Sequence, residues 1–208
     1  MSMNIKKQHP LVIGTIILTV TGLISRLIGF FYRIYLSRLF GEEGMGIYQL
    51  LSPVLSIAFS LTAAGYQTAI SKMVAESTAL RHPSLKPVAA GLSISLPLSL
   101  LCTAVVYNGA EYIAVNLLQE SRTISMIKIL AFSIPFSSVH ACINGYFYGI
   151  KKAGSPASGQ LFEQLVRVVC VYLLTTYSFQ KGQTPSVTIA VLGLAIGEFF
   201  SLLQSIVS

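Results

Sequence analysis

The first apolar segment of the chain contains the stretch Gly22-Leu-Ile-Ser-Arg26-Leu-Ile-Gly29-Phe-Phe-Tyr-Arg33. Residues seven apart on a helix differ by only about 20° in direction, so Arg26 and Arg33 share one face, with Gly22 and Gly29 on nearly the same stripe. An arginine near the middle of a bilayer costs about 2.5–3.5 kcal/mol on insertion scales. Two arginines on one glycine-lined face therefore indicate that this helix meets something anionic.

The composition is that of an integral membrane protein. Of the 208 residues, 53% are hydrophobic and 10% are charged, and the mean hydropathy is +0.72, whereas soluble domains average about 25% charged residues. The formal net charge is +7. The basic residues stand singly or in pairs between apolar runs, however, which is typical of membrane topology signals and not of a nucleic-acid-binding surface.

Six apolar segments are each long enough to cross a hydrocarbon core, which needs about 20 helical residues. They cover residues 10–40, 46–75, 88–118, 123–150, 157–179 and 186–208. A polar glycine turn, Gly41-Glu-Glu-Gly-Met-Gly46, is expected between the first two. A transmembrane barrel would show short alternating strands instead, so the sequence predicts an all-α, polytopic membrane protein with six transmembrane helices.

The basic residues of the loops predict the orientation. With a cytoplasmic N-terminus, the inner side carries Lys6, Lys7, Lys72, Arg81, Lys86, Lys151 and Lys152, and the outer side carries Arg38, Arg122 and Lys181. The positive-inside rule therefore favours an N-terminus in the cytoplasm. The chain ends at Ser208 inside an apolar run, from which we expect the N-terminal part of a longer protein; the alternative is a short native tail.

Ionisable residues also occur in the last two segments. Glu163 and Arg167 are four residues apart, the spacing at which side chains meet on one helix face. They are either an internal ion pair that lowers the cost of insertion, or a gate or coupling pair on a cavity wall. Glu198 is the acid of the sixth segment, where it either pairs with a buried arginine or couples transport to protons.

Small residues and prolines predict how the helices pack. Gly145-xxx-Gly149 and Gly193-xxx-Gly197 allow close approach of neighbouring helices. Pro53, Pro97 and Pro135 fall within apolar segments, where we expect kinks whose freed carbonyls are satisfied by neighbouring helices or at cavities.

The chain shows no sign of catalysis. His140 stands in the fourth segment without a carboxylate or second histidine at helical spacing, so a packing role is expected and no metal site. No Gly-x-Ser-x-Gly, HExxH or P-loop pattern is present. We therefore expect neither an enzyme nor a cofactor. Because arginine binds phosphate bidentately, the residues favour a transporter for an anionic, lipid-attached solute.

Several motifs, in order, resemble those of the polysaccharide-biosynthesis flippases. They are Ser25-Arg26-Leu-Ile-Gly29-Phe30-Phe-Tyr-Arg33, Ser37-Arg38-Leu-Phe-Gly41-Glu-Glu-Gly44-Met-Gly46-Ile-Tyr48-Gln49, Asn144-Gly-Tyr-Phe-Tyr-Gly149 and Pro156-Ala-xx-Gln160-xx-Glu163-Gln164-xx-Arg167. The family belongs to the multidrug/oligosaccharidyl-lipid/polysaccharide exporter superfamily, and the resemblance is greatest to its stage V sporulation protein B branch.

This resemblance implies an exporter fold of two six-helix lobes around a central cavity, of which this chain supplies the N-terminal lobe. It implies a flippase of the bacterial cell membrane that moves undecaprenyl-diphosphate-linked saccharides, including the peptidoglycan precursor, by alternating access. Arg26 matches the family's diphosphate-binding arginine, and Arg33 matches less closely. A missing C-terminal lobe or a second half-chain is the implied partner. The alternatives are a drug/cation antiporter of the same fold and a non-transporting scaffold for cell-wall synthesis enzymes.

Overall fold

A computed structural model describes residues 9–80 and 84–207, and all regular structure within these residues is helical. The elements are α1 (His9–Leu50), α2 (Ser52–Phe59), η2 (Ser60–Ala64), α3 (Gly65–Ala79), α4 (Lys86–Asn108), α5 (Ala110–Tyr112), η3 (Ile113–Leu117), η4 (Ser121–Thr123), α6 (Ile124–Gly149), α7 (Gly154–Gln180) and α8 (Thr188–Val207). The predicted all-α class is confirmed. Lys6, Lys7, Arg81 and Ser208, which entered the predictions of orientation and length, lie outside the described residues.

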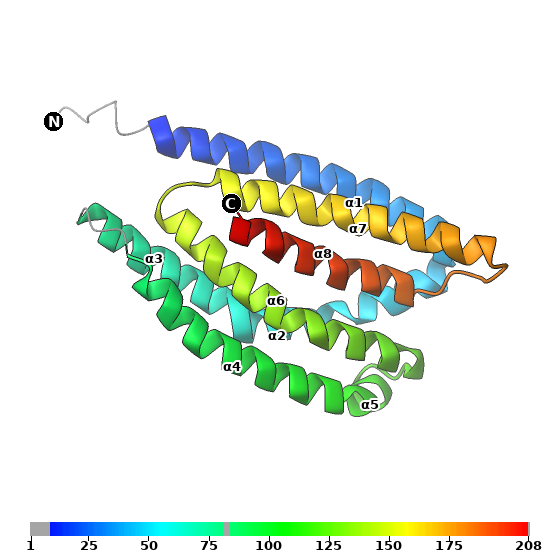
Figure 1. Cartoon of the computed structure of the whole chain (residues 1–208). Helices are drawn as coiled ribbons and strands as arrows, with labels where there is room; N and C mark the ends of the chain where they lie inside the picture. The colour runs from blue at the N-terminus through cyan, green and yellow to red at the C-terminus, as the bar shows by residue number, and fades with distance from the viewer. Residues whose placement is uncertain (1–8, 81–83, 208) are drawn as a thin grey trace.

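Among the described residues, five helical stretches are long and apolar enough to cross a membrane, and the first runs from Gly14 to Ala79. Within it, α1 is interrupted at Gly41, whose φ of 69° and ψ of −174° suit a residue without a Cβ. Figure 1 shows the chain turning back toward α2 after the blue part of α1. The turn is thus shorter than the predicted Gly41–Gly46, because the residues after Gly41 are helical again. The division into six spans stays a prediction.

Helix α6 lies at the centre of the bundle. It packs against α3 and α4 on one side and against α8 on the other, and α8 in turn packs against α7 and α7 against α1 (Figure 1). The main core cluster accordingly forms around α6, where Ile127 and Leu130 are almost completely buried. Many large apolar side chains of α1, α4 and α7 are exposed instead, as expected of helix faces that meet lipid.

The Gly-xxx-Gly pairs lie where helices approach closely. A Cβ on Gly149 would lie 2.6 Å from Val74 Cβ of α3, and one on Gly145 would lie 2.8 Å from the Gln67 carbonyl oxygen. A Cβ on Gly193 would lie 2.3 Å from Val171 Cγ2 of α7. Gly197 lies against the same helix, and a Cβ there would be 3.2 Å from the backbone carbonyl oxygen of Glu163.

Proline has different consequences in different helices. Pro135 lies inside α6 and has no N–H to donate to Ala131, four residues earlier. The Thr103 hydroxyl of α4 lies 2.8 Å from the Ser99 carbonyl oxygen of its own helix and 3.1 Å from the Ala131 carbonyl oxygen. Its single proton is shared between the two acceptors, so the carbonyl freed by Pro135 has a partner on a neighbouring helix. Pro53, by contrast, is in the first turn of α2. Only Leu51 separates α2 from α1 within the helical stretch Gly14–Ala79, so a helix interruption does lie next to Pro53, and the proline is accommodated in a first turn.

Replacing Thr103 by valine should destabilise the bundle by about 1 kcal/mol, because the Ala131 carbonyl then loses its partner from α4. Thermal unfolding in detergent measures the change. Thr68→Val is the matched control, since the exposed Thr68 hydroxyl bonds only within its own helix. Equal unfolding temperatures for the two variants would contradict this account of the Pro135 turn.

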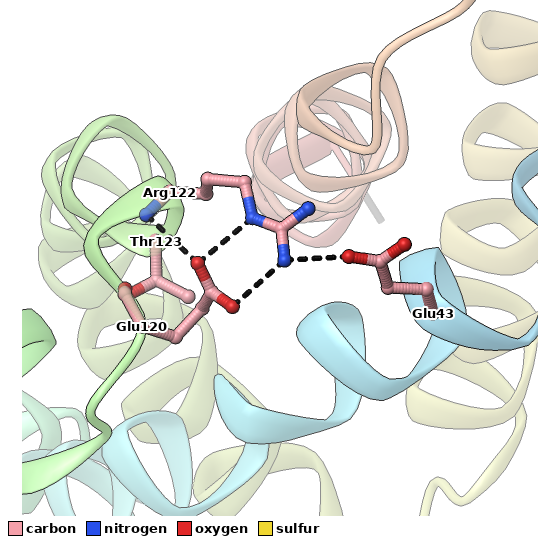
Figure 2. Close-up of polar contacts among 4 residues, drawn as sticks. All are labelled: Glu43, Glu120, Arg122 and Thr123. Atoms are coloured by element: carbon pink, nitrogen blue, oxygen red, sulfur yellow. Dashed lines mark hydrogen bonds and ion pairs between the residues drawn. The ribbon is translucent and has the colours of Figure 1, made fainter.

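An ion cluster joins two connections at one end of the bundle (Figure 2). The Arg122 guanidinium lies 2.7 Å from Glu43 Oε1, just after the Gly41 turn, and donates to both Glu120 oxygens at 2.8 and 2.9 Å. The backbone N–H of Arg122 also donates to Glu120. These hydrogen bonds hold the pKa of the Glu120 carboxyl below its ordinary value.

The cluster should therefore depend on pH in a defined direction. A carboxyl whose pKa is lowered by folding stabilises the fold above its unfolded pKa, and that contribution is lost as the pH falls through the folded pKa. We expect Arg122→Gln to raise the pKa of Glu120 toward the ordinary value of about 4.3. Side-chain carboxyl NMR titration measures this, with Lys128→Gln as the control, and an unchanged Glu120 titration in Arg122→Gln would contradict the assignment.

Candidate functional site

Three arginines from two helices line one cavity of about 400 Å³. Arg26 and Arg33 come from α1, and Arg167 comes from α7. The cavity is lined by Arg26, Gly29, Phe30, Tyr32, Arg33, Leu36, Met45, Tyr48, Gln164 and Arg167. None of these described lining residues is acidic, so the space, called the arginine cavity below, is strongly cationic.

Two hydrogen-bond donors of the arginine cavity have no partner. Within residues 9–80 and 84–207, the buried atoms Tyr32 Oη and Arg167 Nε make no hydrogen bond. A buried polar group without a partner costs about 1–3 kcal/mol. The arrangement thus leaves donors and positive charge available to an acceptor-rich, negatively charged group.

The packing of α1 on α7 creates this cavity. Gly29 leaves room for Gln164, since a Cβ there would lie only 3.1 Å from Gln164 Nε2. Further along the same interface, Tyr35 Oη and Thr175 Oγ1 are hydrogen-bonded at 2.8 Å. Tyr32 and Leu36 are buried with Val171 in a small core cluster at the same interface. The glycine therefore positions the polar face of α7 beside the arginine face of α1.

Arg167 also forms an ion pair with Glu163 on α7. Both side chains are largely buried, with 18% and 19% of their surfaces exposed. A buried charge normally needs such a partner. The pair leaves Arg167 Nε free, so one side of the guanidinium is neutralised while the other remains available.

A second polar cluster lies between α6 and α8. His140 Nδ1 is 3.5 Å from Glu198 Oε2, and Ser137 Oγ donates to Glu198 Oε1 at 2.7 Å. On the other edge of the imidazole, Nε2 lies 3.4 Å from Ser201 Oγ. The expectation that His140 is only a packing residue missed this carboxylate, because it comes from a different helix. Glu198 thus meets His140 directly, while Arg167 lines the same cavity and acts on Glu198 at longer range.

Arg167 is common to both polar regions. Besides the arginine cavity, it lines a second cavity of about 310 Å³ that also contains Ser137 and Glu198. This second space is called the serine cavity below, because Ser52, Ser56 and Ser133 line it as well. A third cavity, of about 410 Å³, shares Arg33 and Tyr48 with the arginine cavity and Ser52 with the serine cavity.

The structure brings most of the predicted site residues together, but not all. Arg26, Arg33 and Arg167 share a cavity, and Glu163 and Glu198 lie next to it. A Cβ built on Gly22 would meet no atom of another described helix within 4 Å. Tyr32 and Tyr48 also line the arginine cavity, although the sequence did not predict them as site residues. Gln164 could have been predicted as a site residue, because it lies three residues before Arg167 on the polar face of α7.

Long apolar helices define a multi-pass membrane protein, and the arginine cavity opens on the face of α1 that carries the exposed Arg26 and Arg33. The chain belongs to the polysaccharide biosynthesis protein family, whose model matches residues 11–207. Stage V sporulation protein B of Bacillus subtilis (strain 168) is 33% identical over 192 residues, which are 91% of this chain and 37% of that protein. The lipid II flippase MurJ of the same organism is 25% identical over 202 residues, 91% of this chain and 37% of that protein.

The chain therefore spans little more than a third of the length of these curated relatives, at 37% of each. No solved structure matches it significantly. In the part of the chain that the structure describes, no group of three His, Cys, Asp or Glu side chains could hold a metal ion.

Proposed function

We propose that this chain is one lobe of a flippase that moves diphosphate-linked lipid saccharides across the bacterial cell membrane, with Arg26 and Arg33 binding the diphosphate. The observation that carries the proposal is the arginine cavity, with its two unpartnered buried donors. A diphosphate offers several acceptor oxygens and at least two negative charges, which suit planar guanidinium groups. The conversion of buried, unpaired donors into charge-assisted hydrogen bonds favours binding.

The relatives support this class of substrate. One is by name a lipid II flippase and another a sporulation protein, so a peptidoglycan precursor or related saccharide unit is the proposed cargo and cell-wall synthesis the proposed setting. Transport, and not catalysis, is the proposed activity. The N-terminus is placed in the cytoplasm on the basis of the positive-inside rule.

A complete transport cavity needs a second lobe. Alternating access is a rocking of one helix bundle against another, and this chain covers 37% of stage V sporulation protein B. We propose that the partner lobe comes from further residues of the same protein, or else from a second half-chain. In either case the arginine cavity faces the partner, and Glu163, Arg167 and Glu198 act as the gate or coupling group.

Two other functions make different predictions. A drug/cation antiporter needs carboxylates facing its ligand, but the described residues lining the arginine cavity include none. Under that function, removal of Arg26 should leave transport of cationic drugs intact or improve it. A scaffold for cell-wall synthesis enzymes requires no ligand at all, so Arg26→Gln should be silent while changes on exposed loops should abolish partner binding.

Complementation distinguishes these functions. The chain replaces the corresponding third of stage V sporulation protein B, and the chimera is expressed in bacteria depleted of their own flippases. We expect growth with the chimera, no growth with Arg26→Gln at equal membrane levels, and partial growth with Arg26→Lys. Arg38→Gln, on the same helix but outside the arginine cavity, is the control. Full growth with Arg26→Gln would reject the proposed function.

A further inference from the structure

Arg167 lies between the arginine cavity and a group of ionisable side chains deeper in the bundle. On one side it lines the arginine cavity with Arg26 and Arg33. On the other it pairs with Glu163 and lines the serine cavity with Glu198. A ligand that binds the free Nε edge of Arg167 therefore shares the charge of the guanidinium with Glu163.

The ionisable group contains four side chains from three helices. Glu163 and Arg167 come from α7, His140 from α6 and Glu198 from α8, and each carboxylate lies within electrostatic range of both Arg167 and His140. Tyr32 and Tyr48 of α1 are the titratable groups that face Arg167 from the other side. With a neutral imidazole, two carboxylates face one guanidinium, so the group has one net negative charge. One proton makes it neutral.

The structure contains a place for that proton. His140 Nδ1 and Glu198 Oε2 are 3.5 Å apart, which is longer than a hydrogen bond, and Oε2 has no hydrogen-bond partner among the described residues. The other Glu198 oxygen is fixed by Ser137, and the far edge of the imidazole faces Ser201. Histidine is the side chain that ordinarily titrates near neutral pH. Protonation of the imidazole, at whichever ring nitrogen lacks a proton, would convert this contact into a charged pair.

Resting on the proposed function, we propose that the His140–Glu198 contact is a proton-binding site coupled to the arginine cavity through Arg167. When an anionic diphosphate bonds to Arg167, Glu163 and Glu198 lose part of the positive charge that balances them. Coulomb interactions are strong in such a buried site, so uptake of a proton by the His140–Glu198 pair becomes more favourable. Because coupling between two sites is reciprocal, the proton in turn strengthens diphosphate binding.

Calorimetry on the full 208-residue chain in lipid nanodiscs tests this coupling. The probe is the symmetric dimethyl ester of diphosphate, with one methyl ester on each phosphate group. Each phosphate then keeps one acidic group, which stays ionised near neutral pH. Titrations in two buffers of different ionisation enthalpy count the protons exchanged. We expect uptake of up to one proton per anion, and an affinity that rises by up to about tenfold for each unit by which the pH falls.

His140→Gln and Glu198→Gln should each abolish the proton uptake while the anion still binds at the alkaline end of the range. Thr176→Val, on an exposed face of α7, is the control and should leave the uptake unchanged, since that hydroxyl bonds to Tyr172 of its own helix. Equal heats in both buffers, with binding intact, would overturn the coupling and leave the proposed function standing. If neither buffer shows binding, and the Arg26→Gln chimera also grows normally, the proposed function itself is wrong.

Discussion

Replacing Arg26 by glutamine should weaken the binding of a short-chain prenyl diphosphosugar by about tenfold to a hundredfold, because one charge-assisted hydrogen-bond donor contributes about 1.5–3 kcal/mol. Arg26 and Arg33 lie on the same face of α1 and line the same cavity. The double replacement with Arg33→Gln should therefore reduce binding further. Fluorescence titration of the chain in nanodiscs measures both affinities.

The matched control is Arg38→Gln. It removes the same charge from the same helix, but Arg38 is not among the described residues that line the arginine cavity. Its effect should be smaller than about threefold, since Arg38 does not line the cavity and its charge acts on a ligand there only through salt-containing solvent. Equal losses for Arg26→Gln and Arg38→Gln would mean that the cavity attracts anions only through its overall charge.

Replacing Gly149 by alanine should destabilise the bundle by about 1–3 kcal/mol, the usual cost of overpacking. The new Cβ would lie 2.6 Å from Val74 Cβ, 2.7 Å from Val74 Cγ1 and 2.9 Å from the Ser71 carbonyl oxygen. Relief of these contacts requires α3 and α6 to move apart. The expected result is a clearly lower unfolding temperature in detergent.

Gly22→Ala is the control for this experiment. This change also replaces a helical glycine by alanine, but the new Cβ would meet no atom of another described helix within 4 Å. The better helix propensity of alanine should leave the stability unchanged or raise it by up to about 1 kcal/mol. If Gly149→Ala is as stable as Gly22→Ala, then α3 and α6 are not in the close contact described here.

The fold could be predicted largely from local properties of the sequence. Long apolar runs with few charges allow only helices in a membrane, and the predicted segment 123–150 differs from α6 by one residue at each end. The form of the interruption at Pro53 could not be predicted, because a proline within an apolar run fits a kink as well as a helix start. The extent of the Gly41 turn depends on a single backbone conformation, which composition does not specify.

The site was predictable only within each helix. The seven-residue spacing of Arg26 and Arg33 places them on one face, and the four-residue spacing of Glu163 and Arg167 predicts that they can meet. No comparable spacing in the sequence predicts which residues of different helices will meet. The approach of His140 to Glu198 depends on how α6 packs against α8, and that of Arg167 to the arginine face depends on how α7 packs against α1.

Site-specific photocrosslinking tests the central claim most directly. A photoreactive residue is introduced at Gln164, which lines the arginine cavity, or at its neighbour Leu165, whose side chain is exposed on the surface of α7. We expect a radiolabelled prenyl diphosphosugar to label position 164, and inorganic diphosphate to compete with that labelling. Label at position 165 should be weaker and insensitive to the competitor. Equal labelling at both positions, unaffected by diphosphate, would contradict a diphosphate site in the arginine cavity.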